Sequence, residues 1–294
     1  MLVFQLVLVF LILLLLTYEN SGHVLPNQLK LPSSSLNDNI KTLKDYIINT
    51  YNQCKNDVEL KLKFNAKKGD NNKFVDRLED DNNEALKLVN KIISSKDGWE
   101  YVNTKDDVIV EKRFLPAGKF VEGKDAAKGG KHACVKSVGI LNASPESLYK
   151  LFLDNSRVSE YNEHCETVKD IEYYPRKNSK IVWACSPKYG PFKARDFCSV
   201  VNYIKSSGGK YIILNRPAYH KSYPPSNKYV RATILLAANI IEPCGKGKSK
   251  LTQIAHLNPG GAADNSAAAW IINQLCAVGP PTFMKKLEKA ARKK

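Results

Sequence analysis

The sequence predicts an α+β domain in which a curved antiparallel sheet wraps around a long C-terminal helix. The chain has 294 residues, of which 43% are hydrophobic and 25% charged, so it can build a substantial core and is neither collagen-like, wholly disordered nor a polytopic membrane protein. Strand-like runs separated by Gly, Pro and Asn-Ser turns follow one another at hairpin spacing. A long helical stretch, about Asn265 to Ala291, follows the last of them. A helix, many strands and a closing helix are the order of an α+β fold.

The first segment, residues 1–22, is predicted to be a secretory signal peptide. Leu2 to Leu16 is apolar except for Gln5. As a helix this run reaches about 22 Å, short of the roughly 30 Å hydrocarbon core of a bilayer. We therefore expect a secreted or lumenal protein that is peripheral on membranes. The run has no Lys or Arg before it and only a poor cleavage site at Ser21-Gly22, so an uncleaved signal anchor is the alternative.

Residues 23–81 are predicted to be a low-complexity extension. They are rich in Asn, Lys, Asp and Ser and contain too little apolar surface to form a core. Apolar residues at helical spacing between Ile40 and Tyr51 indicate one short amphipathic helix within it. The pattern indicates no role for this segment.

The folded domain is predicted to span residues 82–294 and to begin with a helix that ends at Asp97-Gly98. Its apolar stripe consists of Ala85, Leu86, Leu88, Val89, Ile92 and Ile93. Strands are expected at 99–103, 108–114 and 133–141. A second helix follows, which Ser144 caps and Pro145-Glu146 begins, because a serine oxygen and a first-turn proline suit the free amides of a helix start.

The remaining strands are expected at 166–174, 180–185, 197–204, 210–215, 229–241 and 250–257. A strand with one wet face alternates apolar and polar residues, whereas the second half of Val230 to Ile241 is apolar on both faces. One of these faces can pack on a helix, and the other lines either a filled core or a cavity. The small residues Ala232, Ala237 and Ala238 leave room, but the strand pattern itself leaves both alternatives open.

Several functions lack their usual residues. The 45 Lys and Arg against 29 Asp and Glu give a net charge of +16, yet no RNP, KH or Cys/His finger pattern accompanies it, so no nucleic-acid partner is expected. The seven cysteines contain no CxxC pair, so neither a metal site nor a disulfide scaffold is predicted. No GxSxG elbow occurs, and the stretch Gly245 to Ser249 lacks the first glycine of a phosphate loop and is interpreted as a hairpin turn. We predict no catalytic residue, no metal and no cofactor.

An ordered set of motifs resembles the START lipid-transfer domains. Its members are Asp97-Gly98-Trp99, Ser144-Pro145-Glu146, the stretch Lys188 to Phe197, Asn258-Pro259-Gly260-Gly261, Trp270 to Asn273 and Gly279 to Phe283, and they span residues 82–294. The resemblance implies a helix-grip fold, in which a bent antiparallel sheet surrounds a lipid tunnel closed by the C-terminal helix. It further implies a non-enzymatic, monomeric carrier of phospholipid between membranes, with phosphatidylcholine-transferring members as the nearest relatives. Pro280-Pro281 is then either the place where this lid bends or a boundary between two helices.

The resemblance places two arginines near the lipid. Arg195 and Asp196 match a pair at the mouth of the family's tunnel, but the acid expected ten positions earlier is Cys185. A buried Arg195 therefore needs another acceptor, which is Asp196, a backbone carbonyl or the lipid phosphate. The phosphate-binding arginine of phosphatidylcholine-specific members matches Val158, and Arg157 is its neighbour.

The choline-binding aromatics of those members match Ala184, Phe197 and Leu235, with Trp183 beside the first. A cation–π cage needs several rings, so the resemblance implies a carrier with broad head-group tolerance. Four further polar residues are expected to line the tunnel, namely Tyr211, Asn239, His256 and Asn273.

Docking on an anionic membrane surface is assigned to Phe283, Lys285, Lys286 and Lys289, because the C-terminal helix is basic and amphipathic. The alternative is a solvated helix face with Phe283 packed inward. Two other functions stay open: a membrane-tethered lipid sensor or scaffold, and a hydrolase or cyclase on the same fold.

Overall fold

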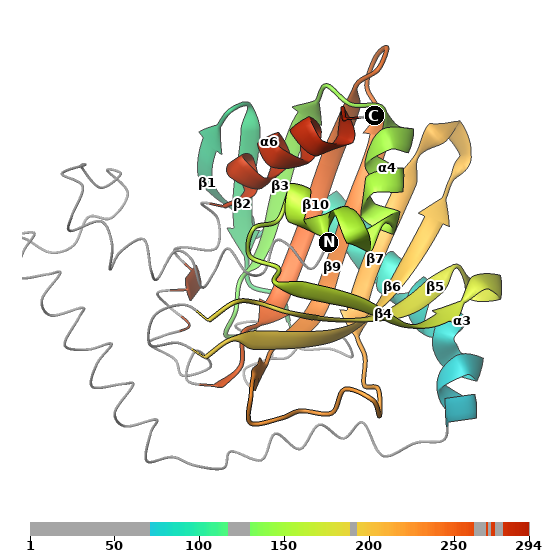
Figure 1. The fold of residues 1–294 in the computed structure, drawn as a ribbon. Coiled ribbons are helices and arrows are strands. Elements are labelled where there is room, and N and C mark those ends of the chain that lie inside the picture. Colours follow the sequence, from blue (N-terminus) through green and yellow to red (C-terminus); the bar gives the residue numbers. More distant parts are fainter. Residues whose placement is uncertain are drawn as a thin grey trace, which may run out of the picture. The chain divides into compact units, whose positions relative to one another are not determined.

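A long, curved antiparallel sheet dominates the computed structural model, which describes residues 71–116, 130–188, 193–261, 269, 272–273 and 279–293 (Figure 1). Within these residues ten strands pair in the order β1-β2-β3-β10-β9-β7-β6-β5-β4, and β8 joins β6 in parallel. The strands are β1 (Glu100–Lys105), β2 (Val108–Arg113), β3 (Cys134–Leu141), β4 (Thr167–Tyr174), β5 (Ser179–Cys185), β6 (Arg195–Lys205), β7 (Tyr211–Pro217), β8 (Val230–Arg231), β9 (Thr233–Pro243) and β10 (Ser249–Asn258). The predicted α+β class and helix-grip arrangement are confirmed.

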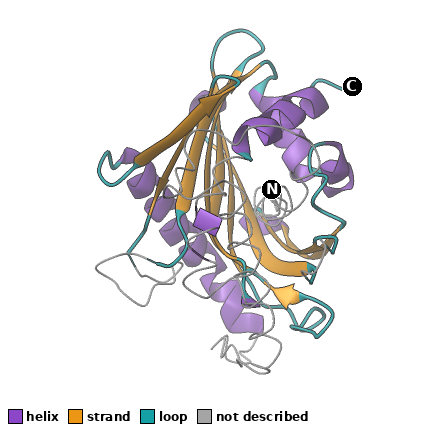
Figure 2. Cartoon of the chain, turned by 90° about the vertical axis from the view of Figure 1, so that its left-hand side faces the viewer, coloured by secondary structure: helices purple, strands orange, loops and turns teal. Residues whose placement is uncertain are grey.

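Helices cover the two faces of this sheet (Figure 2). The inner face packs against α4 (Pro145–Leu153) and α6 (Pro280–Ala291), and the outer face packs against α3 (Asn71–Ser94). Short 3-10 turns lie at η3 (Asn155–Glu160), η4 (Pro175–Lys177) and η5 (Ser207–Gly209). Because successive strand residues point to opposite faces, a residue's cluster identifies its face. Ala237 and Ile241 pack with α4 and α6, whereas Leu236 and Ile240 pack with α3.

The apolar run from Val230 to Ile241 behaves as its composition predicts, since both faces of β9 are covered. The run is not one strand, however. It divides at Ala232, whose backbone N–H donates to the Asp196 carbonyl at 2.9 Å. Before this residue β8 pairs with β6, and after it β9 pairs with β7 and β10. The Gly245 to Ser249 stretch includes the turn of the β9–β10 hairpin, as expected.

Helix α3 begins within the segment that the sequence assigns to the extension, before residue 82. Leu78 is fully buried against Ile181 and Val200 of the outer face. Asn82 donates to Ser179 Oγ at 3.1 Å and accepts from Arg216 Nε at 2.9 Å. Exposed charged residues such as Asp76, Glu79 and Asp80 hide the helical stripe in the sequence. The domain therefore uses residues that the predicted boundary excludes.

Helix α4 confirms its predicted cap, because Ser144 Oγ accepts the Ser147 backbone N–H at 3.1 Å. Helix α6 begins at Pro280, so both prolines lie in its first turn. The backbone N–H groups of a first turn have no carbonyl partner within the helix, so a proline there costs no helical hydrogen bond. The two prolines thus start this helix rather than interrupt it. Most of residues 265–278 lie outside the described residues, as do the signal segment and residues 23–70. Of the helices that are described, none combines the length and apolarity needed to cross a membrane.

Helix α6 lies very close to β3. A Cβ atom placed on Gly139 would be 2.9 Å from Met284 Sδ and 2.9 Å from Val108 Cγ2. Only a glycine fits between the strand and the helix at this contact. The C-terminal helix therefore covers the inner face at β2 and β3 and touches η3 and α4 at its other side.

Candidate functional site

The inner face under α4 and α6 is mainly apolar. Ile213 and Leu251 are among its buried members. Side chains of the two helices pack against them, namely Phe152 of α4 and Phe283, Met284 and Leu287 of α6. A surface of this composition suits hydrocarbon. The polar groups on this face are few, so their positions determine which part of a bound molecule lies where.

Arg195, at the start of β6, shares the inner face with Phe197 because the two are separated by one residue. Its side chain is 6% exposed, and one guanidinium nitrogen donates to the Lys193 carbonyl at 2.8 Å. Burial lowers the pKa of Arg195 to about 10. Of the acceptors that the sequence left open, a backbone carbonyl is among the groups that Arg195 contacts.

Asp196 lies on the opposite face and has its own partners. Both Arg231 Nε and an Arg231 terminal nitrogen donate to it at 2.8 Å, and Trp183 Nε1 donates at 3.0 Å. Trp183 also stacks on Tyr223 with ring centroids 4.9 Å apart. Trp183 and Asp196 thus belong to an outer cluster, whereas Phe197 and its cross-strand partner Ala184 belong to the inner face.

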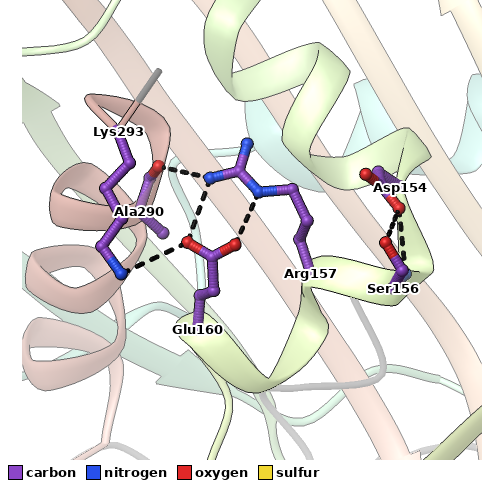
Figure 3. Close-up of polar contacts among 6 residues, drawn as sticks. All are labelled: Asp154, Ser156, Arg157, Glu160, Ala290 and Lys293. Carbon is purple, nitrogen blue, oxygen red and sulfur yellow. Dashed lines mark hydrogen bonds and ion pairs between the residues drawn. The ribbon is translucent and has the colours of Figure 1, made fainter.

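Arg157 lies in η3 and bonds to α6 rather than to the sheet (Figure 3). Its Nε and a terminal nitrogen donate to the Glu160 carboxylate at 2.6 and 3.0 Å, and the same terminal nitrogen donates to the Ala290 carbonyl at 2.9 Å. Lys293 Nζ lies 3.5 Å from Glu160. The hydrogen bond from Arg157 lowers the pKa of Glu160 to about 2. We call Arg157, Glu160, Ala290 and Lys293 the α6 latch.

The other predicted lining residues divide between the two faces. Tyr211 stacks on Tyr149 at 4.5 Å on the inner face, and Asn239 accepts from Gln253 Nε2 there at 2.6 Å. His256 pairs with Leu236, a member of the outer cluster. Its Nε2 lies 2.8 Å from the His132 carbonyl, and burial lowers its pKa to about 4.

Two residues occupy neither position. Leu235 is buried beside the irregularity in the β9–β10 pairing. Asn273 fastens its own segment to the chain before β3, because its Oδ1 accepts from the Ala133 N–H at 2.8 Å and its Nδ2 donates to the Lys131 carbonyl at 2.7 Å. The structure therefore brings Arg195, Phe197, Tyr211 and Asn239 to one face.

The predicted docking residues of α6 point in different directions. Phe283 is buried, with its ring edge to face with Tyr161 at 6.0 Å. Lys286 pairs with Glu163 at 2.7 Å, Lys285 lies 3.9 Å from Asp106, and Lys289 is exposed. In this arrangement the basic side of α6 faces outward and Phe283 contacts the core.

Sequence reasoning missed other polar groups of the inner face. Ser137, Gln253 and Ser199 lie there, each at a position that alternates with residues of the outer face. The alternation of a serine or glutamine with apolar residues was the signal for them. Lys180 is a further buried polar residue, and the sequence pattern did not indicate its burial. Its Nζ lies 2.9 Å from Asp170 and 3.1 Å from the Leu153 carbonyl. Across the described part of the chain, no group of His, Cys, Asp and Glu is arranged to hold a metal ion.

Comparison with known proteins agrees with this architecture. The family model of the START domain matches residues 79–294. START domain-containing protein 10 of Homo sapiens and that of Mus musculus are each 32% identical over 146 residues, which are 44% of this chain. The matched part is 47% of either relative, so the chain spans about half the length of these curated proteins.

Two solved human structures share the fold. Human STARD10 gives a TM-score of 0.58 at 21% identity over 70% of this chain and 77% of its own. Human StAR-related lipid transfer protein 5 gives a TM-score of 0.58 at 15% identity over 71% of this chain and 94% of its own. Since the family model covers nearly all of the described residues and the sheet, α4 and α6 have the expected order, this chain belongs to the START domain family.

Proposed function

We propose that this chain binds a phospholipid against the inner face of its sheet and carries it between membranes. The observation that carries the proposal is an apolar inner face covered by a C-terminal helix that polar contacts hold at its end. Membership of the START family supports it, and one relative of the same fold is named as a lipid transfer protein.

The physical reason for a carrier is the cost of exposing hydrocarbon to water. A two-chain phospholipid carries about thirty chain carbons at ~0.8 kcal/mol each, so its exposure costs roughly 20 kcal/mol or more. An apolar protein surface replaces the bilayer at similar free energy and lowers the barrier. Transfer then needs neither a covalent step nor an energy source, and the lipid moves down its own gradient.

Broad head-group tolerance follows from the aromatic residues near Arg195. Of the positions that match the choline-binding aromatics, Phe197 offers one ring on the inner face. Trp183, the aromatic residue beside the matched position Ala184, stacks on Tyr223 and donates to Asp196 instead. A single ring does not enclose a quaternary ammonium. Arg195 offers a buried cation to any phosphate, and thus favours phospholipids as a class.

We further propose that the protein docks as a monomer on anionic membranes through the outward side of α6. Lys285 and Lys289 are exposed there, and the whole chain carries +16. Each cation near such a surface contributes about 1 kcal/mol, so docking is reversible and weakened by salt. The buried Phe283 reaches the bilayer only after α6 moves.

The route to these membranes is proposed from residues 1–22, which resemble a secretory signal peptide. Sequencing the N-terminus of the protein made in a secretory host tests this. A mature chain that starts after residue 22 supports a secreted or lumenal carrier, whereas an intact Leu2 to Leu16 run supports a tethered protein.

The function is tested with the full chain and two vesicle populations. Donor vesicles carry fluorescent phosphatidylcholine or phosphatidylethanolamine, and acceptor vesicles carry none. We expect the protein to accelerate the transfer of both lipids well above the protein-free rate. Arg195→Gln is expected to slow both, while Arg176→Gln, a change at an exposed arginine of η4, leaves both unchanged. Transfer at the protein-free rate for every phospholipid contradicts the proposal.

A further inference from the structure

Three neutral polar side chains cross the inner face at one level. Gln253 of β10 lies opposite Ser137 of β3 on one side and opposite Asn239 of β9 on the other. Their exposed fractions are 4%, 0% and 3%. Apolar members of the inner cluster, such as Leu251 and Ala255, flank this level along β10. A polar row buried between apolar rows is unfavourable unless its groups are hydrogen-bonded.

The hydrogen bonds in this row run in one direction. Ser137 Oγ donates to Gln253 Oε1 at 3.4 Å, and Gln253 Nε2 donates to Asn239 Oδ1 at 2.6 Å. Each amide oxygen thereby accepts one hydrogen bond. The side-chain amide nitrogen of Asn239 donates to no acceptor among the described residues. The row therefore ends in a hydrogen-bond donor.

A second donor lies on the same face. Ser199 of β6 is fully buried, and its hydroxyl has no hydrogen-bond partner in the described structure. It shares the inner face with Val201 and Phe197, its neighbours at alternate positions of β6. Asn215 of β7, opposite Ala237 on β9 and Val201 on β6, lies between Ser199 and Asn239. We call Ser137, Gln253, Asn239, Asn215 and Ser199 the polar band.

The polar band carries no charge, and this determines what it can bind. The largely buried cations of the inner face include Arg195, at the start of β6, Lys180, which pairs with Asp170, and Lys112 of β2, which pairs with Glu100. A phosphate favours such cations over neutral amides. Neutral donors in an apolar setting suit a neutral acceptor that is itself flanked by hydrocarbon, and an ester carbonyl of a diacyl lipid has this chemistry.

We propose that the polar band binds the ester carbonyl groups of a two-chain lipid, with the acyl chains on the apolar surface beside it. The inference rests on the proposed function and adds the part of the lipid that the interior recognises. Asn239 N–H and Ser199 O–H donate to carbonyl oxygens, while Ser137 and Gln253 hold the Asn239 amide in the donating orientation. The specificity is for the linkage between glycerol and chain, and it is independent of the head group.

The test compares two phosphatidylcholines that differ only in this linkage. Diester and diether lipids with the same head group and the same chains are offered to the full-length protein from otherwise identical vesicles. An ether oxygen is a much weaker acceptor than a carbonyl. We expect the amount of diester lipid bound at equilibrium, measured by mass spectrometry, to exceed that of diether lipid about fivefold to tenfold, as one or two neutral hydrogen bonds predict.

Variants assign the preference to the polar band. Ser199→Ala and Asn239→Leu are expected to lower the diester preference while leaving diether binding in place. The matched control is Thr252→Val, the neighbour of Gln253 on the opposite face, which is expected to keep the wild-type preference. Ser199→Ala removes one unpartnered hydroxyl and so keeps the test valid if Asn239→Leu does not fold.

Three outcomes overturn the inference or its basis. Equal binding of the two lipids by the wild-type protein overturns the inference and leaves lipid transfer intact. A wild-type preference that survives both substitutions also overturns it, because the donors then lie elsewhere. If neither lipid is bound or transferred, the proposed function itself fails.

Discussion

His256 is a neutral histidine buried on the outer face of the sheet, opposite Leu236. It is fully buried, its Nε2 hydrogen-bonds to the His132 carbonyl, and burial holds its pKa at about 4. Above about pH 6.5 the folded and the unfolded chain both hold it uncharged. Below that pH the unfolded chain binds a proton that the folded chain refuses until about pH 4. The free energy of unfolding therefore falls as the pH falls through this window.

We expect His256→Gln to reduce this loss of stability. Between pH 7 and pH 5 the wild-type protein should lose about 2 kcal/mol through His256, in addition to the loss from other groups. Glutamine keeps a donor for the His132 carbonyl and does not titrate. Urea unfolding at the two pH values measures the difference. Identical pH dependence of wild type and variant would show that His256 is protonated equally in both states.

Gly139 sets the distance between β3 and α6. Since a Cβ would lie 2.9 Å from Met284 Sδ, Gly139→Val must push the helix away or displace Val108. We expect a loss of about 1–3 kcal/mol in the free energy of unfolding, as for other overpacked contacts. Ile140→Val, at the exposed neighbouring position, is the control and should be near neutral. Equal stability of the two variants in thermal unfolding would contradict the close approach.

Residue positions were predictable from the sequence wherever strand alternation is regular. Arg195 and Asp196 are neighbours, so their separation onto two faces follows from the strand itself. The same reasoning places the neighbours Trp183 and Ala184 on opposite faces of the sheet. Leu235 could not be assigned, because the β9–β10 pairing passes from Leu236 directly to Ile234, leaves Leu235 without a partner in this pairing and reverses the alternation along β9. No local pattern announces that shift.

At the scale of elements, the α6 latch fixes one end of the C-terminal helix. Arg157 and Lys293 join the end of α6 to η3 through Glu160 (Figure 3). The Asn142 backbone N–H also donates to Glu288 at 2.7 Å. We expect Arg157→Met to increase amide hydrogen exchange in residues 288–293 about threefold to tenfold, because the Ala290 carbonyl loses its charged donor. Exchange in the central strands should stay unchanged.

The control for the latch is Glu146→Gln on α4. It removes an exposed ion pair with Lys150, whose atoms lie 2.8 Å apart, and such pairs contribute little. If both variants give the same exchange in α6, the latch does not hold the helix.

The start of α4 was predictable, because its chemistry is local. Ser144 and Pro145 identify the start of α4 from two adjacent residues. The start of α3 was hidden, because Phe74 and Leu78 face the sheet within a run of Asp, Arg and Asn. Their burial depends on β5 and β6, which come more than a hundred residues later in the chain and leave no trace in the local composition.

At the scale of the whole molecule, the domain boundary has a measurable consequence. A chain that begins at residue 82 lacks Leu78 and Asp81, and Asp81 lies 3.6 Å from the buried Arg216. We expect residues 82–294 to be less stable than residues 71–294 by about 3–5 kcal/mol, since a buried leucine is lost and a buried arginine loses its carboxylate. Urea unfolding of the two fragments measures this, and equal midpoints would show that the first turns of α3 are dispensable.

The motifs in the sequence predicted the family and the order of the elements, but not the polar band. Ser137 and Gln253 are more than a hundred residues apart along the chain, whereas Gln253 and Asn239 lie on the two strands of one hairpin. Only the register of β3 against β10 brings them to one level. Sequence could propose Asn239 alone, whereas its role in a directional row required the pairing of three strands.

The strand order also constrains how the chain folds during synthesis. β3 has no sheet neighbour other than β2 until β10 is made, because the strands in between build the opposite wing of the sheet. A nascent chain that has passed β7 therefore carries two separate half-sheets, each with an open hydrogen-bonding edge. The interior closes only when β10 and α6 have left the ribosome, so we expect a chain truncated before β10 to aggregate rather than to fold into a smaller domain.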